Sequence, residues 1–157
     1  MVYLALKALH VLAAVIFLGN IITGLFWHAY AARTRDAKVL THALGGIILS
    51  DRLFTVPGVI VILVSGVLLA IHGGYPLLRT GWILWAIVLF GVSGLVFMFR
   101  VAPLQRQLLA MAQVGAERAD FDYTPYRKLA MRWELWGAIA LLSPIAALLI
   151  MTLKPAW

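Results

Sequence analysis

The chain has 157 residues, of which 64% are hydrophobic and only 12% are charged. Ordinary soluble domains are about half apolar and about a quarter charged. This composition therefore excludes an ordinary soluble protein and indicates an integral membrane protein, with the lipid bilayer as its first partner. The absence of cysteine excludes disulfides, thiolate metal sites, iron–sulfur clusters and cysteine nucleophiles. The net charge of +7 does not indicate a nucleic-acid partner, because the basic residues lie between apolar runs, where membrane topology requires them.

Long, continuous apolar runs predict an all-α fold, an integral membrane four-helix bundle that forms one domain over residues 1–157. The runs do not alternate, as strands of a barrel would, and an open sheet would leave backbone groups unpaired in lipid. A span needs about 20 residues, which places the four spans at about 4–27, 50–71, 81–100 and 130–153. Two interfacial helical stretches are expected at about 37–49 and 104–114.

The first span carries four residues that are unusual in an apolar segment, namely Lys7, His10, Asn20 and His28. His10 and His28 are separated by about five turns of an α-helix, so they share one face roughly 27 Å apart. That face could form the wall of a site. His28, beside Trp27, is expected at the membrane interface. The apolar run exceeds the usual core of a signal peptide, so we expect it to be retained as a span.

A polar loop leads into the second span, and Asp36 in this loop is placed to cap the next helix. Pro57 predicts a kink, because proline lacks an N–H and its ring collides with the preceding turn. Asp51 and Arg52 fall near the inner edge of the hydrocarbon, where charges usually pair. We therefore expect an ion pair between Arg52 and Asp51 or Glu134, either as a structural bridge or as part of a proton relay.

The third span contains a small face formed by Gly91, Ser93 and Gly94, where another backbone could approach closely. This face would also suit a homodimer. The fourth helix is predicted to begin at Thr124 as the cap, with Pro125 at its first position.

Basic residues set the orientation of a membrane protein. The first and third loops with their flanks hold Arg33, Arg35, Lys38, Arg100, Arg106, Arg118, Arg127, Lys128 and Arg132, whereas the opposite side holds Lys7, Arg79 and Lys154. The count is nine against three. We therefore expect a multi-pass protein of the bacterial inner membrane, with loops one and three in the cytoplasm and both termini outside.

Few residues of the sequence are candidates for a catalytic or ligand-binding role. Phosphate loops, nucleophile elbows and His-Glu-x-x-His pairs are missing from the sequence. A histidine inside a span, such as His10, is costly without a partner or a task. It could be an axial ligand to haem iron, or it could hydrogen-bond to Ser or Thr of a neighbouring helix. Arg52, Arg100 and Arg132 near the inner end could bind an anionic headgroup or a propionate, or could simply provide the positive-inside charge.

Several short motifs are distributed over all four predicted spans: Lys7-Ala8-Leu9-His10, Phe17, Gly19, His28-Ala29, Asp51-Arg52-Leu53-Phe54-Thr55-Val56-Pro57, Gly66, Gly81-Trp82, Arg132-Trp133 and Lys154-Pro155. Together they resemble the HemJ-type protoporphyrinogen oxidases. The whole chain resembles more closely a family of predicted integral membrane proteins of unknown function, which is related to the HemJ-like and copper-resistance-D-like proteins.

The resemblance implies a membrane bundle that binds b-type haem or porphyrin, with His10 as the axial metal ligand. Lys7, Arg52 or Arg132 would then contact the anionic groups. If the chain is an enzyme, the resemblance implies a haem-dependent membrane oxidoreductase. The HemJ-type lysine after the third-span tryptophan is absent from residues 83–88. Two other functions stay open: a small permease or metal-handling component, although the methionines do not cluster as copper sites favour, and a structural membrane scaffold.

Overall fold

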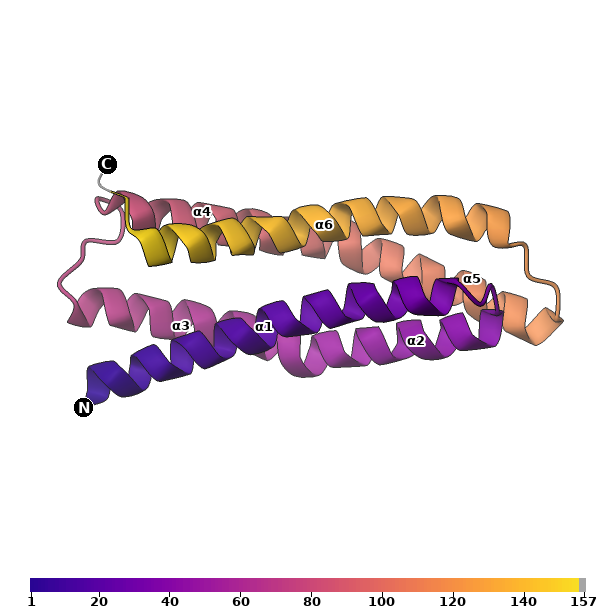
Figure 1. Ribbon diagram of the computed structural model, residues 1–157, viewed down its shortest axis with the longest axis horizontal. Coiled ribbons are helices and arrows are strands. Elements are labelled where there is room, and N and C mark those ends of the chain that lie inside the picture. The colour runs from indigo at the N-terminus through magenta and orange to yellow at the C-terminus, as the bar shows by residue number, and fades with distance from the viewer. Residues whose placement is uncertain (156–157) are drawn as a thin grey trace.

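The structure, a computed structural model, describes residues 1–155, and the last two residues of the predicted domain lie outside this range. The described chain is helical and contains no strand, which confirms the predicted fold class. Within residues 1–155, four helices are long and apolar enough to cross a membrane, namely Val2–Ala32, Ala37–His72, Gly81–Arg118 and Tyr123–Leu153. They run along one common axis (Figure 1). We call the end where the first helix begins and the last helix ends the terminal end, and the end with loops 33–36 and 119–122 the loop end.

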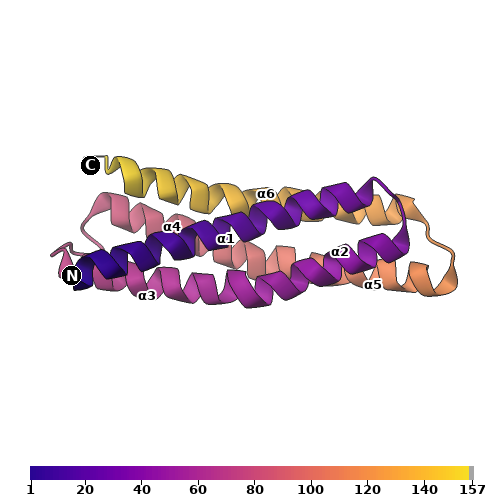
Figure 2. The ribbon, with the colours of Figure 1, turned by 60° about the horizontal axis from the view of Figure 1, so that its bottom comes forward.

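The first and last helices, α1 (Val2–Ala32) and α6 (Tyr123–Leu153), are continuous. The two middle helices are each interrupted by one π-helical turn. The second comprises α2 (Ala37–Ser50), η1 (Asp51–Thr55) and α3 (Val56–His72), and the third comprises α4 (Gly81–Val96), η2 (Phe97–Val101) and α5 (Ala102–Arg118). The predicted stretches at 37–49 and 104–114 thus fall in α2 and α5, which continue the bundle toward the loop end (Figure 2).

A proline follows each π-helical turn. Pro57 and Pro103 are each the second residue of the α-helix that comes next. In a regular helix the proline ring would collide with the carbonyl four residues earlier. The turns widen before the prolines, so that Val56 N–H donates to Asp51 O and Ala102 N–H donates to Phe97 O. The disturbance predicted at Pro57 is therefore a wide turn, a feature that is frequent at functional sites.

The two ends of the bundle pack differently. Toward the terminal end, α1 packs on α3 and α4 packs on α6, whereas α3 and α4 do not pack on each other within residues 1–155. Figure 1 shows the α4/α6 pair above the α1/α3 pair. Toward the loop end, α2 and α5 pack together and close the bundle with α1 and α6. The fully buried side chains gather there: Leu40, Leu44, Leu108, Ala112, Tyr126 and Ala130.

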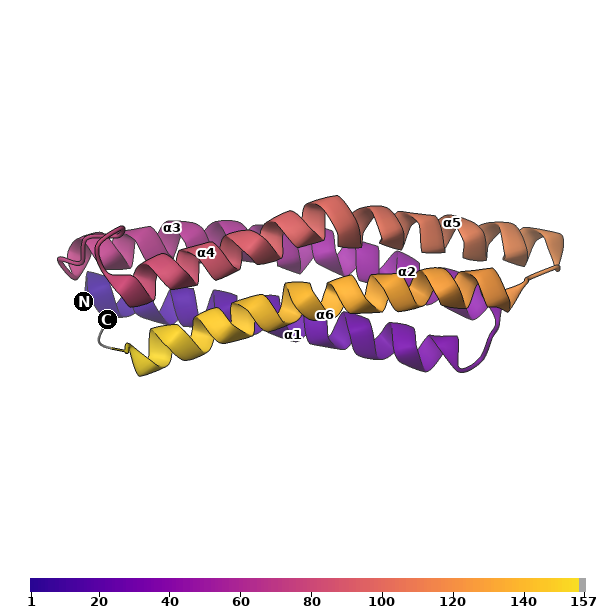
Figure 3. The same cartoon turned by 90° about the horizontal axis from the view of Figure 1, so that it is seen from above.

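The lengths of the helices indicate where hydrocarbon would lie. The second and third helices have 36 and 38 residues, which corresponds to roughly 55 Å at 1.5 Å per residue. A bilayer core is about 30 Å thick, so about half of each helix extends beyond it. Figure 3 shows α4 and α5 running the full length of the bundle. The polar character of α5 and the basic residues near this end indicate that the extension lies at the loop end; they include Arg33, Arg35, Lys38, Arg118 and Lys128.

The residues of the small face predicted in the third span do not all pack in the same way. The Ser93 hydroxyl is buried and donates to the Ala140 carbonyl of α6 at 2.6 Å, which confirms a close helix contact. A side chain at Gly91 or Gly94 would meet nothing within 4 Å. These two glycines therefore line open space and do not form a backbone contact within the described bundle.

Candidate functional site: a central cavity with a buried carboxylate

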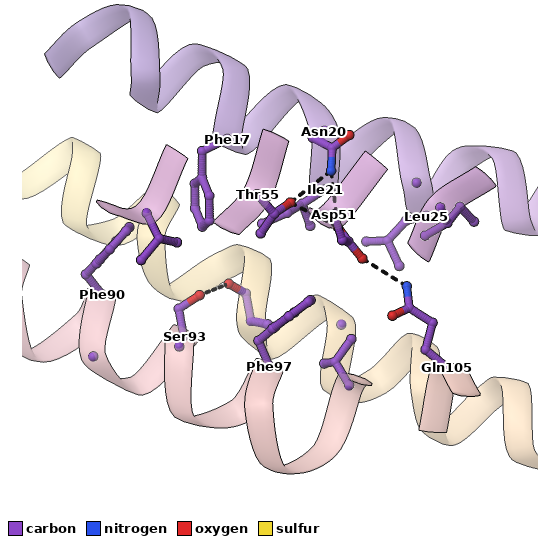
Figure 4. Close-up of a pocket in the computed structure, with 18 of the residues that line it drawn as sticks. Phe17, Asn20, Ile21, Leu25, Asp51, Thr55, Phe90, Ser93, Phe97 and Gln105 are labelled. Carbon is purple, nitrogen blue, oxygen red and sulfur yellow. Dashed lines mark hydrogen bonds between the residues drawn. The ribbon is translucent and has the colours of Figure 1, made fainter. Parts of the chain in front are cut away.

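A cavity of about 270 Å³ lies between the two helix pairs. Its walls are mostly apolar and come from all four long helices. Four polar side chains form one side of it: Asn20 of α1, Asp51 and Thr55 of η1, and Gln105 of α5 (Figure 4). Ligand pockets usually measure about 300–1,000 Å³. The cavity therefore suits a small molecule.

Asp51 lies at the centre of this polar side and is only 9% exposed. Its Oδ1 accepts hydrogen bonds from Asn20 Nδ2 at 3.1 Å and from Thr55 Oγ1 at 2.9 Å. Its Oδ2 accepts from Gln105 Nε2 at 3.0 Å. The Asn20 amide also donates to Thr55 Oγ1 at 2.8 Å. Every one of these groups donates toward the carboxyl, which is the pattern expected around an ionised carboxylate.

The carboxylate of Asp51 has no cationic partner within 4 Å among residues 1–155. The predicted ion pair of Arg52 is wrong, because Arg52 is exposed and Glu134 instead binds Arg127 at 2.7 Å. The side chains of successive helical residues point about 100° apart. Because the side chain of Asp51 points into the bundle, the side chain of Arg52 points outward. An ionised carboxylate has about four acceptor positions. Three are used here, and one stays free for a ligand.

Aromatic rings add to the apolar walls of the cavity. Phe17 of α1 and Phe90 of α4 join the two helix pairs, with ring centroids 5.4 Å apart. Phe97 and Trp133 also line the space. In Figure 4, the rings of Phe90 and Phe97 lie across the cavity from Asn20 and Thr55, and the ring of Phe17 lies on the same side as Thr55. Aromatic faces attract cations, so these walls and Asp51 favour the same sign of charge.

A second polar cluster surrounds His28, which is fully buried. Its Nε2 lies 2.9 Å from the hydroxyl of Tyr126, and its Nδ1 lies 3.7 Å from a carboxylate oxygen of Glu134. The ring of Trp133 packs edgewise on His28, with centroids 4.7 Å apart. The ring of His28 is therefore covered by α6, which supplies its polar neighbours, and its predicted position at the membrane interface stays a prediction.

His10 lies on the inward side of α1 and is partly buried. Its Nδ1 lies 2.9 Å from Ser65 Oγ of α3, which confirms the predicted hydrogen bond to a neighbouring helix. The ring also packs closely on Gly66, where an added Cβ would lie 3.1 Å from His10 Cε1. Lys7 is exposed one turn earlier on the same helix. His10 and Lys7 could therefore contact one bound group.

The other two residues predicted to hold a haem lie elsewhere. Asn20 contacts η1 and follows His10 by about 15 Å along α1, so Arg52 is roughly that far from His10 along the axis. Arg132 lines a separate surface pocket with Arg100. The described structure also contains no group of three His, Asp or Glu side chains that could hold a metal ion. The four predicted residues do not form one site.

Two residues of the central site are easier to identify from the sequence than the other two. Asn20 and Asp51 are conspicuous because each interrupts a long apolar run. Thr55 lies one turn after Asp51, so its contact could have been anticipated from helical spacing. Gln105 was missed, because it is one of several polar residues on α5 and only its contact with Asp51 distinguishes it.

A family model described as "Predicted integral membrane protein (DUF2269)" matches residues 4–155. No curated protein and no solved structure matches the chain. The resemblance to HemJ-type and copper-resistance-D-like proteins therefore stays an expectation from short motifs. Because the family model covers nearly the whole chain, the protein belongs to the DUF2269 family of predicted integral membrane proteins.

Proposed function

We propose that this protein binds a small organic cation in its central cavity, as a small permease or cation-binding membrane component, with Asp51 as the counter-ion. The observation that carries the proposal is the buried Asp51 carboxylate, which has three neutral donors and no cation within 4 Å in residues 1–155. An unpaired charge in an apolar interior costs several kcal/mol. An occupant of positive charge would offset that cost.

The donor set favours an organic ammonium over a metal ion. Divalent metals take several oxygen, nitrogen or sulfur ligands, and the cavity offers one carboxylate. Its apolar walls and the rings of Phe17, Phe90 and Phe97 suit the body of an amine. One ammonium N–H could use the acceptor position of Asp51 that the protein leaves free. The volume of about 270 Å³ limits the occupant to a small amine.

The helix arrangement supports access to the cavity. Since α3 and α4 do not pack on each other within the described bundle, the two pairs could separate there if the contact between the Phe17 and Phe90 rings is broken. Gly91 and Gly94 leave part of the α4 wall without side chains. The orientation stays as predicted, in a bacterial inner membrane with loops one and three cytoplasmic. It is supported by the basic residues at the loop end.

Two ligands of matched size test the proposal. The protein, purified in mild detergent, is titrated with benzylamine, which is protonated at pH 7, and with benzyl alcohol, which is neutral. We expect a measurable heat of binding for the amine. Asp51→Asn should weaken this binding roughly ten- to a hundredfold, which corresponds to the loss of one hydrogen bond to a charged group. Glu117→Gln, which removes an exposed charge on α5, is the control. Equal binding of both ligands, or unchanged binding in Asp51→Asn, would refute the proposal.

A second candidate is binding of b-type haem or porphyrin, and the geometry of His10 favours it. The Ser65 hydroxyl donates to the Val61 carbonyl, so its oxygen accepts from Nδ1–H of His10. The lone pair of His10 is then on Nε2, where it could bind iron, and a partner on the other nitrogen commonly orients such ligands. Lys7 could contact a propionate. When bound, the haem would supply redox chemistry.

An absorption spectrum tests this second candidate. The purified protein is measured in its oxidised and dithionite-reduced forms, with and without added haem, beside His10→Ala. A Soret band that shifts on reduction and is lost in the variant supports the candidate. A protein that stays colourless after addition of haem counts against it. This test is independent of Asp51, so the two candidates can fail separately.

A further inference from the structure

A second pocket lies on the surface of the bundle, between the η2–α5 junction and α6. Its volume is about 290 Å³. Two arginines from different helices line it, Arg100 of η2 and Arg132 of α6, together with Gln107 and Trp136. The guanidinium of Arg100 lies over the Trp136 ring, 5.4 Å from its centroid. The pocket thus gathers two permanent positive charges and an amide donor beside an aromatic ring.

Neither arginine is neutralised by the protein. No carboxylate of residues 1–155 lies within 4 Å of Arg100 or Arg132. Glu134 is near in sequence but binds Arg127. It lies two residues from Arg132, which places its side chain on nearly the opposite side of α6. The pocket is therefore open to an anion, and two guanidinium groups match the oxygens of a phosphate.

The position of the pocket along the bundle axis indicates what kind of phosphate could reach it. Arg100 follows the start of α4 at Gly81 by about 28 Å of helix, close to the thickness of a hydrocarbon core. The pocket would therefore lie at the membrane boundary, where tryptophan is also enriched. On its hydrocarbon side, Leu95, Met98 and Phe99 are 59%, 64% and 66% exposed. These side chains form an apolar surface along which acyl chains could lie.

We infer that this pocket binds the phosphate headgroup of an anionic phospholipid at the loop-end boundary of the membrane. Arg100 and Arg132 bind the phosphate oxygens, Gln107 donates an additional hydrogen bond, and Trp136 holds the guanidinium of Arg100 in place. The acyl chains extend over Phe99 toward the terminal end. The site is separate from the Asp51 cavity and does not depend on what that cavity binds.

Three ligands and a matched set of variants test the inference. The delipidated protein in mild detergent is titrated with dioleoyl phosphatidylglycerol, with dioleoyl phosphatidylcholine and with inorganic phosphate, and binding is followed by microscale thermophoresis. We expect the anionic lipid to bind most tightly. Arg100→Gln with Arg132→Gln should weaken its binding by about 25-fold, or roughly fivefold for each arginine. Arg106→Gln with Arg118→Gln, which removes two exposed charges of α5 outside the pocket, should change it less than twofold.

A lysine pair separates recognition from folding. Arg100→Lys with Arg132→Lys keeps both charges, so it should fold and keep most of the affinity for the anionic lipid. Equal binding of the two lipids would overturn the inference, as would an equal effect of the control variant. If inorganic phosphate binds as tightly as the anionic lipid, the assignment to a lipid is overturned.

Discussion

Removing Gln105 should reveal how strongly α5 is tied to η1. Gln105 is 4% exposed and supplies the hydrogen bond to Oδ2 of Asp51 at 3.0 Å. A hydrogen bond to a charged group contributes about 1.5–3 kcal/mol, whereas side-chain hydrogen bonds measured within a membrane protein reach about 1.7 kcal/mol at most. We therefore expect Gln105→Leu to lower the free energy of unfolding by about 1.5 kcal/mol. Gln113→Leu, at an exposed position of the same helix, should lower it by less than about 0.5 kcal/mol.

A double-mutant cycle isolates the contact from other effects of the substitution. Asp51→Leu alone leaves Gln105 without its acceptor, and Gln105→Leu alone leaves Asp51 Oδ2 without its donor. In the double variant neither Gln105 nor Asp51 is left without its partner, because both side chains are gone. Its loss of unfolding free energy should therefore be about 1.5 kcal/mol smaller than the sum of the losses in the two single variants. The assay is reversible unfolding in mixtures of mild detergent and dodecyl sulfate, followed by far-ultraviolet circular dichroism. Additivity within about 0.5 kcal/mol would show that the Asp51 and Gln105 side chains do not interact.

Two further predictions use the same unfolding assay. A methyl group at Gly115 would overlap the ring of Phe121, so Gly115→Ala should destabilise by about 1–3 kcal/mol, whereas Gly45→Ala meets nothing within 4 Å and should stabilise by up to about 1 kcal/mol. Equal effects of the two would contradict the packing. Tyr126→Phe should cost about 1–3 kcal/mol, because it leaves Nε2 of the fully buried His28 without a partner. A loss no larger than that of exposed Tyr3→Phe would argue against this buried hydrogen bond.

Helix boundaries could be predicted from sequence where neighbouring residues decide them. Asp36 caps α2 as predicted, accepting from the backbone N–H of Lys38 and Val39. The last helix begins two residues earlier than predicted, at Tyr123 and not at Pro125, because Asp122 accepts from the Thr124 N–H and acts as the cap in place of Thr124. Both residue types are good caps, so local chemistry allowed either start.

The cavity could not be predicted from sequence, because it depends on how far the helices are shifted along one another. Asn20 and Asp51 are visible as polar residues in apolar runs, but their contact requires the observed alignment of α1 with η1. Likewise, the burial of His28 against Tyr126 depends on the alignment of α1 with α6. Gln105 reaches Asp51 because α5 extends the bundle toward the loop end, whereas the sequence predicted a stretch at the membrane surface.

Selective labelling of a single cysteine tests the central claim that Asp51 makes the cavity a cation site. The chain has no cysteine, and Gly91 lines the cavity with room for a side chain. Gly91→Cys is reacted with the cation aminoethyl methanethiosulfonate and with the anion sulfonatoethyl methanethiosulfonate. Gly46→Cys, an exposed position on α2 with no atom within 4 Å of the added Cβ, is the control.

We expect the cation to label Gly91→Cys on the order of tenfold faster than the anion. Adding Asp51→Asn should abolish this preference, while the labelling of Gly46→Cys should stay unchanged. Equal rates for the two reagents at Gly91→Cys, or a preference that persists in Asp51→Asn, would contradict the claim that the Asp51 carboxylate selects positive charge in the cavity.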